Sequence, residues 1–403
     1  MKELYTYTFY FIFTLVFLIG GFLQFFVGIP NTLITYIIVS VLILFYIFYA
    51  LVKGRVYLNK LTIVIGIFIL WILLSAFVNG TNWLKVIIYL VFAFLPLSIY
   101  LFFKVNQKEN YISQIKISKL FLVIAVIQYP ILLLQNYGFD FLISFNKSSQ
   151  VIASFDFLFG SFFLKADHAL GFFLLINILN LIKNNNEREI TKFPIFAYIY
   201  LSYSVLSSES NVSKLFLIVL FVYFIYNIIP SKVKKIGILV ILVSCFMSYP
   251  VLKKIEFLNK EIEYMKAEYN PIHSYKNYKA KIAKRAQVVI TYATKIPLKL
   301  IGDGPYAYYN ILKGKFKKTH HFSQLIWTYN DLGLVGVLLV ISIIFLLVKD
   351  LNLESDLSIF LLSIILVFSF MTTVFTDAAI MISLTSVLKK NRRYERYSSD
   401  SVS

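Results

Sequence analysis

Runs of apolar residues long enough to cross a lipid bilayer recur along most of this chain. A helix needs about 20 such residues to span about 30 Å of hydrocarbon. The first run, residues 5–27, is longer than the apolar core of a signal peptide and is followed by no small-residue cleavage pattern. Of the 403 residues, 59% are hydrophobic, whereas soluble domains have about 45–50%. The sequence therefore predicts an all-α, polytopic membrane protein.

The apolar runs divide the chain into about twelve expected transmembrane helices, of which the last is short for a crossing. They are expected at residues 5–27, 31–52, 61–78, 84–103, 117–135, 159–181, 193–208, 212–229, 236–251, 326–348, 357–375 and 376–388. Accordingly, residues 1–251 hold the first nine helices, 252–325 form one large loop, 326–388 hold the remaining helices and 389–403 form a polar tail.

Lysine and arginine, which give the chain a net charge of +19, are distributed unevenly between the loops. With the N-terminus in the cytoplasm, the loops and tail on that side are basic. The short loops on the other side, near residues 29, 79–82 and 207–211, contain neither residue type. This is the positive-inside pattern of membrane proteins. It puts residues 252–325 outside the cytoplasm and explains basic charge inside without a nucleic-acid partner.

The large extracytoplasmic loop 252–325 is itself strongly basic, which topology does not explain. Either the loop attracts an anionic ligand or anionic lipid headgroups, or it is a solvated loop of a lysine-rich chain. Residues 275–294 have the spacing of an amphipathic helix on the membrane surface, and Pro297 is expected to end it. The sequence Gly302-Asp303-Gly304-Pro305 predicts a turn.

One arginine and two adjacent histidines in this loop are candidates for chemistry. Arg285 is the only arginine in the loop, and a guanidinium pairs with phosphate oxygens through a fork of donors that lysine lacks. His320 and His321 come just before the span at 326–348, and an imidazole can accept a proton from a hydroxyl near neutral pH. The alternatives are chance usage of arginine and interfacial histidines that contact water.

Polar residues inside the expected spans are costly in lipid and tend to face an interior cavity. Gln24 and Gln128 are of this kind, as is the pair Asp167-His168, which lies about two turns into the span at 159–181. Because the cost is greatest away from the membrane surface, the pair is the hardest of these to explain as simple interface placement.

The sequence gives little support for a metal or a cofactor. If a helix already runs at residue 320, His320 shares a stripe with Gln324, Trp327 and Asp331, and His321 faces elsewhere. No H-E-x-x-H spacing occurs, and the single cysteine, Cys245, excludes a cysteine metal site. The chain also has no G-x-x-x-x-G-K-[ST] loop and no D-x-D pair. We therefore expect metal-free chemistry without a cofactor.

In several short patches the chain resembles the O-antigen polymerase and O-antigen ligase superfamily of bacterial cell-surface glycan enzymes. It departs from the family pattern in having Lys214 in place of arginine, Phe322 in place of asparagine and Asp331 in place of glutamate. The patches are Gly160-Ser161-Phe162-Phe163 with Asp167, Ser213-Lys214, Arg285 with Pro297 and Gly302-Asp303-Gly304, and His321 with Asp331-Leu332-Gly333-Leu334-Val335-Gly336.

The resemblance implies an inverting, metal-independent glycosyl transfer at the outer face of the bacterial inner membrane. The donor would be an undecaprenyl-diphosphate-linked oligosaccharide. Arg285 and Lys214 would hold the diphosphate, and His321 or His320 would be the base. The same patches put five further residues at the substrate, namely Asp167, His168, Gly302, Gly304 and Asp331.

A polysaccharide polymerase that extends O-antigen or capsule repeat units is the first hypothesis. Its implied partners are the lipid-linked oligosaccharide, membrane lipid and a chain-length regulator protein. A ligase of the same superfamily is the close alternative. A lipid-linked oligosaccharide flippase or transporter, or a purely structural membrane subunit, would belong to other classes.

Overall fold

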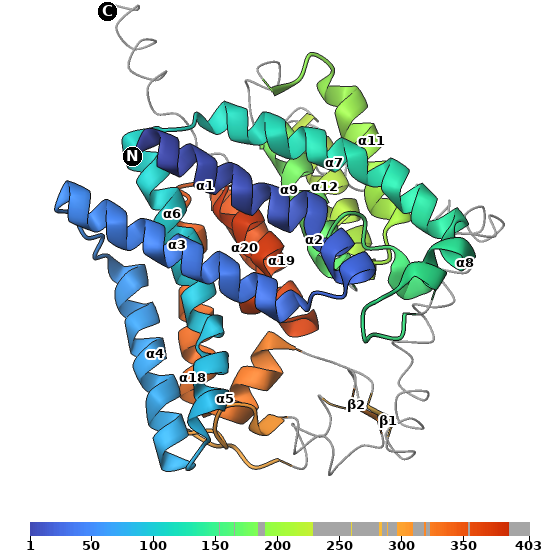
Figure 1. Ribbon diagram of the computed structural model, residues 1–403. Helices are drawn as coiled ribbons and strands as arrows, with labels where there is room; N and C mark the ends of the chain where they lie inside the picture. The colour runs from blue at the N-terminus through green and yellow to red at the C-terminus, as the bar shows by residue number, and fades with distance from the viewer. Residues whose placement is uncertain are drawn as a thin grey trace, which may run out of the picture.

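Apolar runs become helices here because backbone groups within a membrane must pair inside their own segment. The computed structural model is accordingly helical apart from two short strands (Figure 1). It describes residues 1–152, 154–164, 166–183, 190–228, 259, 282–283, 288, 296–308, 318–319, 323–353 and 355–386.

The elements before residue 165 are mostly long helices, with π turns (η1, η2) interrupting the first and 3-10 turns (η3, η4) near residue 150. They are α1 (Lys2–Thr14), η1 (Leu15–Ile19), α2 (Gly20–Phe22), η2 (Leu23–Val27), α3 (Asn31–Lys53), α4 (Lys60–Val78), α5 (Trp83–Tyr89), α6 (Val91–Glu109), α7 (Gln114–Tyr137), α8 (Phe139–Leu142), η3 (Ile143–Phe145) and η4 (Phe155–Phe157).

The later elements include the two strands and one more 3-10 turn, η6. They are α9 (Asp167–Lys183), α11 (Pro194–Ser207), α12 (Asn211–Ile228), β1 (Ile282–Ala283), β2 (Lys318–Thr319), α18 (Gln324–Asp350), α19 (Ser355–Met371), η6 (Val374–Thr376) and α20 (Ala378–Thr385).

Among the described residues, six helices are long and apolar enough to cross a membrane. Four shorter apolar helices accompany them: α9, α11, α12 and α19. The expected total of twelve spans stays a prediction, and the span expected at 236–251 lies outside the described residues. The six long helices are Lys2–Val27, Asn31–Lys53, Lys60–Val78, Trp83–Glu109, Gln114–Tyr137 and Gln324–Asp350.

Several expected boundaries are wrong, each for a local reason. The span expected at 159–181 becomes helical only at Asp167, because residues 159–164 bond to other parts of the chain. The helix expected at 275–294 is wrong at Ile282–Ala283, which pairs in parallel with Lys318–Thr319. A distant backbone partner of this kind leaves no trace in the local apolar spacing.

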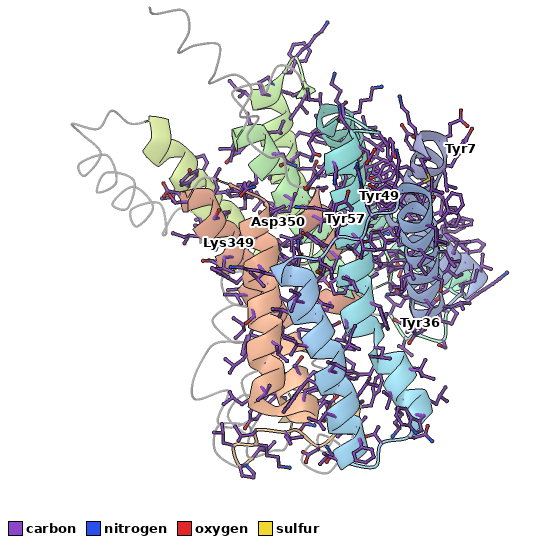
Figure 2. All side chains as sticks on the ribbon, turned by 90° about the vertical axis from the view of Figure 1, so that its left-hand side faces the viewer. Tyr7, Tyr36, Tyr49, Tyr57, Lys349 and Asp350 are labelled. Atoms are coloured by element: carbon purple, nitrogen blue, oxygen red, sulfur yellow. The ribbon has the colours of Figure 1, made fainter. Side chains whose placement is uncertain are left out.

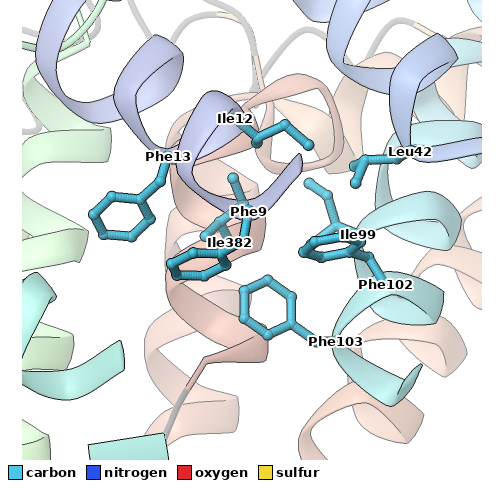
Figure 3. A pocket seen from close by; sticks show the side chains of 8 residues that line it. All are labelled: Phe9, Ile12, Phe13, Leu42, Ile99, Phe102, Phe103 and Ile382. Atoms are coloured by element: carbon cyan, nitrogen blue, oxygen red, sulfur yellow. The ribbon is translucent and has the colours of Figure 1, made fainter. Parts of the chain in front are cut away.

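The core of the bundle surrounds α9 and α20, which lie in the middle of the helices in Figure 1. Every residue of α20 is buried, as are residues 169–181 of α9. Helices that are apolar on all sides take such central positions. A narrow pocket between α1, α3, α6 and α20 has only apolar lining (Figure 3), so it offers no group for chemistry: Phe9, Ile12, Phe13, Leu42, Ile99, Phe102, Phe103 and Ile382.

Among the described residues, the helix ends next to three of the loops that the sequence assigns to the cytoplasm lie together at one end of the bundle. Lys104 Nζ lies 2.9 Å from Asp350 Oδ2, which joins the C-terminal ends of α6 and α18. Lys53 Nζ lies 3.7 Å from Glu109 Oε2, which adds the end of α3. Tyr49 and Tyr57 lie near the level of Asp350 in Figure 2. We call this the basic end.

The opposite end of the bundle holds the turn at residues 302–305. α4 runs away from the basic end, from Lys60 to Val78. Immediately after it, Asn79 Nδ2 donates to the carbonyl oxygen of Gly302 at 2.9 Å. Two of the candidate substrate residues, Gly302 and Gly304, therefore lie at the end remote from Lys104 and Asp350.

We predict that the two ends react with a membrane-impermeant maleimide from opposite sides of the membrane. In a Cys245→Ala background, Arg55→Cys and Asn352→Cys at the basic end should label only after permeabilisation. Asn82→Cys, exposed at the other end, should label on intact cells, as the positive-inside pattern requires. Equal labelling of all three positions on intact cells would contradict this arrangement.

Candidate functional site

Helix α18 is broken near the end that faces the turn. Gly333 has φ 72° and ψ −166°, so the helical path is interrupted there. A non-helical residue leaves neighbouring N–H and C=O groups without their usual partners. Within a membrane such groups need other partners, because each unpaired backbone group destabilises the fold by roughly several kcal/mol.

The segment 299–304 fills this break. Its backbone groups pair with those of α18 on both sides of Gly333, that is, with residues just before and just after the break, much as neighbouring strands pair. Four hydrogen bonds join the two: Leu334 N to Lys299 O (2.9 Å), Val335 N to Leu300 O (3.5 Å), Asp303 N to Asn330 O (2.9 Å) and Gly304 N to Asp331 O (3.0 Å).

Helix α4 supplies the remaining partners. The Trp71 indole Nε1 donates to the carbonyl oxygen of Leu332 at 2.8 Å, and Ser75 Oγ donates to that of Asp331 at 3.0 Å. Sequence reasoning missed both residues. Ser75, a polar side chain in an otherwise apolar helix, was the available signal.

Glycine is required where the two segments cross. A Cβ on Gly302 would lie 2.2 Å from the carbonyl carbon of Asp331, and one on Gly333 would lie 2.3 Å from the carbonyl oxygen of Leu300. Both contacts are with backbone, which no rotamer change relieves. Gly304 has φ 92°, in the region that favours glycine. The two predicted glycine-rich patches thus lie against each other.

The carboxyl group of Asp331 is the anchor of the turn. The residue is fully buried. Four N–H donors converge on its two oxygens: Tyr308 N (2.7 Å) and Asn330 Nδ2 (3.1 Å) on Oδ1, and Tyr306 N (2.9 Å) and Trp327 Nε1 (2.6 Å) on Oδ2. These hydrogen bonds give Asp331 a structural role, and its expected contact with the substrate stays a prediction.

Aromatic rings enclose this anchor. The Trp327 ring stacks on Tyr308 with centroids 5.8 Å apart, and it meets Tyr306 at 5.7 Å and Phe92 at 5.1 Å edge-on. Tyr308 is fully buried. These rings therefore shield the Asp331 hydrogen bonds from water and lipid.

A second cluster joins the starts of α9 and α12. His168 Nδ1 lies 3.1 Å from Ser210 Oγ and 3.5 Å from Asp167 Oδ2. Ser213 Oγ donates to Ser210 Oγ at 2.8 Å, and Lys214 follows it in the first turn of α12. Three of the candidate substrate residues, Asp167, His168 and Lys214, are thus gathered by these two helices.

The two clusters are connected through the end of α19. The His168 ring lies edge-on to Phe368 with centroids 6.1 Å apart. One residue later, the carbonyl oxygen of Ser369 accepts from Ser323 Oγ at 3.3 Å. Ser323 caps the start of α18, the helix that contains Asp331. The turn, α9, α12 and α18 therefore meet at one end of the protein.

Three candidate catalytic residues, Arg285, His320 and His321, lie outside the described residues. The structure does fix where α18 begins. Ser323 has extended backbone angles and its Oγ accepts from Ile326 N, so the helix starts at Gln324. Trp327 and Asp331 therefore do share one face of α18, but Ser323 interrupts the helix before it could extend back to residue 320.

Within the described part of the chain, no three His, Cys, Asp or Glu side chains are grouped to bind a metal. Comparisons with protein-family models, curated proteins and solved structures found no match.

We predict that Asp331→Asn destabilises the protein although the two side chains are nearly the same size. Each carboxyl oxygen accepts two hydrogen bonds, so an amide nitrogen in either position leaves two donors unsatisfied. At about 1–3 kcal/mol for each of the two buried unsatisfied donors, the loss should be about 2–6 kcal/mol. Thermal unfolding of the purified protein in detergent measures it. The matched control is Asp356→Asn, exposed at the start of α19, and an equally stable Asp331→Asn protein would refute the anchor.

Proposed function

We propose that this chain is a membrane glycosyltransferase that polymerises lipid-linked oligosaccharide repeat units. One observation carries the proposal. Patches that resemble the polymerase and ligase superfamily, although separated in sequence, contact each other: residues 302–304 cross residues 331–333. The patches around Asp167 and Ser213 also lie together, at the start of α9 and α12.

The proposed reaction needs no metal and no cofactor. His321 or His320 accepts the proton of an acceptor sugar hydroxyl, and the resulting oxygen attacks the anomeric carbon of the donor. The bond between that carbon and the diphosphate oxygen breaks, with inversion at the carbon. Arg285 and Lys214 stabilise the negative charge that develops on the undecaprenyl diphosphate as it leaves.

The proposed setting is the outer face of a bacterial inner membrane. In it the chain has about twelve spans, and the basic loop 252–325 lies outside the cytoplasm. The loop attracts the anionic diphosphate headgroup, while the spans leave the lipid tail in the bilayer. Further proposed partners are membrane lipid and a chain-length regulator protein.

A transporter is the main alternative from another class, since transporters use discontinuous helices to bind ions and substrates. Helix α18 is discontinuous, but the groups freed at Gly333 are occupied within the chain. The carbonyl oxygens of Asp331 and Leu332 accept from Ser75 and Trp71. The break therefore functions as a docking point for the turn, which favours the enzyme over the transporter.

The product separates a polymerase from a ligase. Lengthening of glycan on the lipid diphosphate supports the polymerase, and transfer to a lipid core or protein supports the ligase. Lipid-linked repeat units that cross the membrane only when this protein is present would instead support the flippase.

We predict that Arg285→Ala abolishes polymer at unchanged protein level, because one diphosphate ligand is lost. Arg285→Lys should restore little, since lysine keeps the charge but loses the fork of donors. Polymer length on gels and the amount of protein in membranes are the measurements. Arg55→Ala, which removes an exposed arginine at the basic end, is the control. Normal polymer with Arg285→Ala would favour a purely structural subunit.

The two histidines should differ sharply when changed singly to alanine. The base is expected to cost about 100-fold or more in rate, the usual contribution of general base catalysis, while its neighbour should retain most activity. His273→Ala, in the same loop, controls for the loss of any imidazole there. If His320→Ala and His321→Ala both give polymer of wild-type length, neither residue is the base.

A further inference from the structure

The buried loop 159–164, just before α9, is held by glutamine side chains from α7. Its backbone is not in a regular helix, yet Phe159 and Phe162 are 4% and 0% exposed. Irregular backbone in such a place needs partners for its N–H and C=O groups. Those partners belong to two helices, α7 and the interrupted first helix.

The side-chain amide of Gln135 bonds to both backbone groups of Gly160, in the way that the backbone of a neighbouring β-strand would. Its side-chain Nε2 donates to the carbonyl oxygen of Gly160 at 2.8 Å, and its Oε1 accepts from the Gly160 N–H at 2.8 Å. Both backbone groups of one residue are thus satisfied by one amide. Gln135 is 6% exposed, so little water competes for these bonds.

Gln128, two turns earlier on the same face of α7, holds the next residue. Its Oε1 accepts from the Ser161 N–H at 2.9 Å, and its Nε2 lies 2.9 Å from Ser161 Oγ. Gly160, with φ 64°, leaves room for it, because a Cβ there would lie 2.3 Å from Gln128 Oε1. This explains why glycine and serine occupy positions 160 and 161.

The first helix closes the other side of the loop through its π turns. Gln24 Oε1 accepts from the Leu164 N–H at 2.9 Å. Ser161 Oγ also donates to the carbonyl oxygen of Phe17 within η1. A π turn shifts the helical hydrogen-bond pattern and often marks a functional position. The loop is therefore held at both ends, at residues 160–161 and at residue 164. We call the hydrogen bonds from Gln128, Gln135 and Gln24 to these residues the clamp.

We infer that Gln128 and Gln135 are positioning residues for the cluster at Asp167 and His168. The clamp ends at Leu164, three residues before α9 begins at Asp167. It thereby sets where His168 meets Ser210, at the start of the helix that contains Lys214. This inference rests on the proposed function, in which that cluster and Lys214 contact the lipid-linked donor.

Helix α7 provides its own control for the loss of a side-chain amide. Gln114, at its other end, donates from Nε2 to the carbonyl oxygen of Ser386 at 2.7 Å. Removing it also deletes an amide-to-carbonyl hydrogen bond from the same helix, but far along the helix from the clamp. Gln114→Leu therefore reports the general cost of losing such a bond.

The test compares Gln128→Leu, Gln135→Leu and Gln114→Leu in the full-length purified protein. Hydrogen exchange followed by mass spectrometry measures the clamp directly, and undecaprenyl diphosphate is the binding probe. Both clamp variants should speed exchange in a peptide covering residues 158–164. They should also weaken binding of the probe by about tenfold, or about 1.4 kcal/mol, because the cluster at Asp167 and His168 is no longer held in place. Gln114→Leu should do neither.

A milder variant guards against misfolding. Gln135→Asn keeps the amide donor and acceptor on a side chain one methylene shorter, so its bonds to Gly160 are weakened rather than deleted. Its exchange and binding should fall between those of wild type and Gln135→Leu. Faster exchange with unchanged binding in both clamp variants would overturn the positioning role while leaving the proposed function in place. Wild-type protein that does not bind undecaprenyl diphosphate at all would overturn the proposed function itself.

Discussion

The pairing of residues 299–304 with the break in α18 is the contact on which this end of the protein depends. A broken helix among membrane-spanning helices exposes backbone groups that lipid cannot satisfy. Here they are satisfied by backbone from the turn and by Trp71 and Ser75 of α4. The turn, α4 and α18 are thus one unit. Hydrogen bonds fix how the three segments align, which apolar packing alone does not specify.

This unit changes how three of the candidate substrate residues are interpreted. Asp331, Gly302 and Gly304 look like ligand-binding residues in the sequence, but their described contacts are with the chain itself. An acidic residue in an apolar setting needs several donors, and four are present. These three residues therefore have a structural role, while their expected contact with the substrate stays a prediction.

The sequence predicts the long helices well because about 20 apolar residues are a strong and local signal. It also predicts a turn at 302–305, and the resemblance groups it with the residues around Asp331. It does not predict the break at Gly333, since a glycine within a helix is compatible with an unbroken one. Nor does it predict the Ile282–Ala283 strand or the late start of α9. Each of these depends on a partner distant in sequence, such as Lys318–Thr319 or Gln135.

Two separate places at this end of the protein have irregular backbone, and in both the backbone groups bond to side chains from spanning helices, of which the sequence analysis singles out only Gln24 and Gln128. Gln128 and Gln135 serve the loop before α9, as Ser75 and Trp71 serve the break in α18. Non-helical backbone among spanning helices is tolerated only where protein buries it or where it borders a cavity. Maintaining it needs buried polar side chains, which are costly in lipid. Gln128 and Gln135 hold the loop that leads into Asp167 and His168. Ser75 and Trp71 hold the break in α18 at the same end of the protein. Both places are remote from the basic end, and this arrangement supports the proposed site for a polar headgroup there.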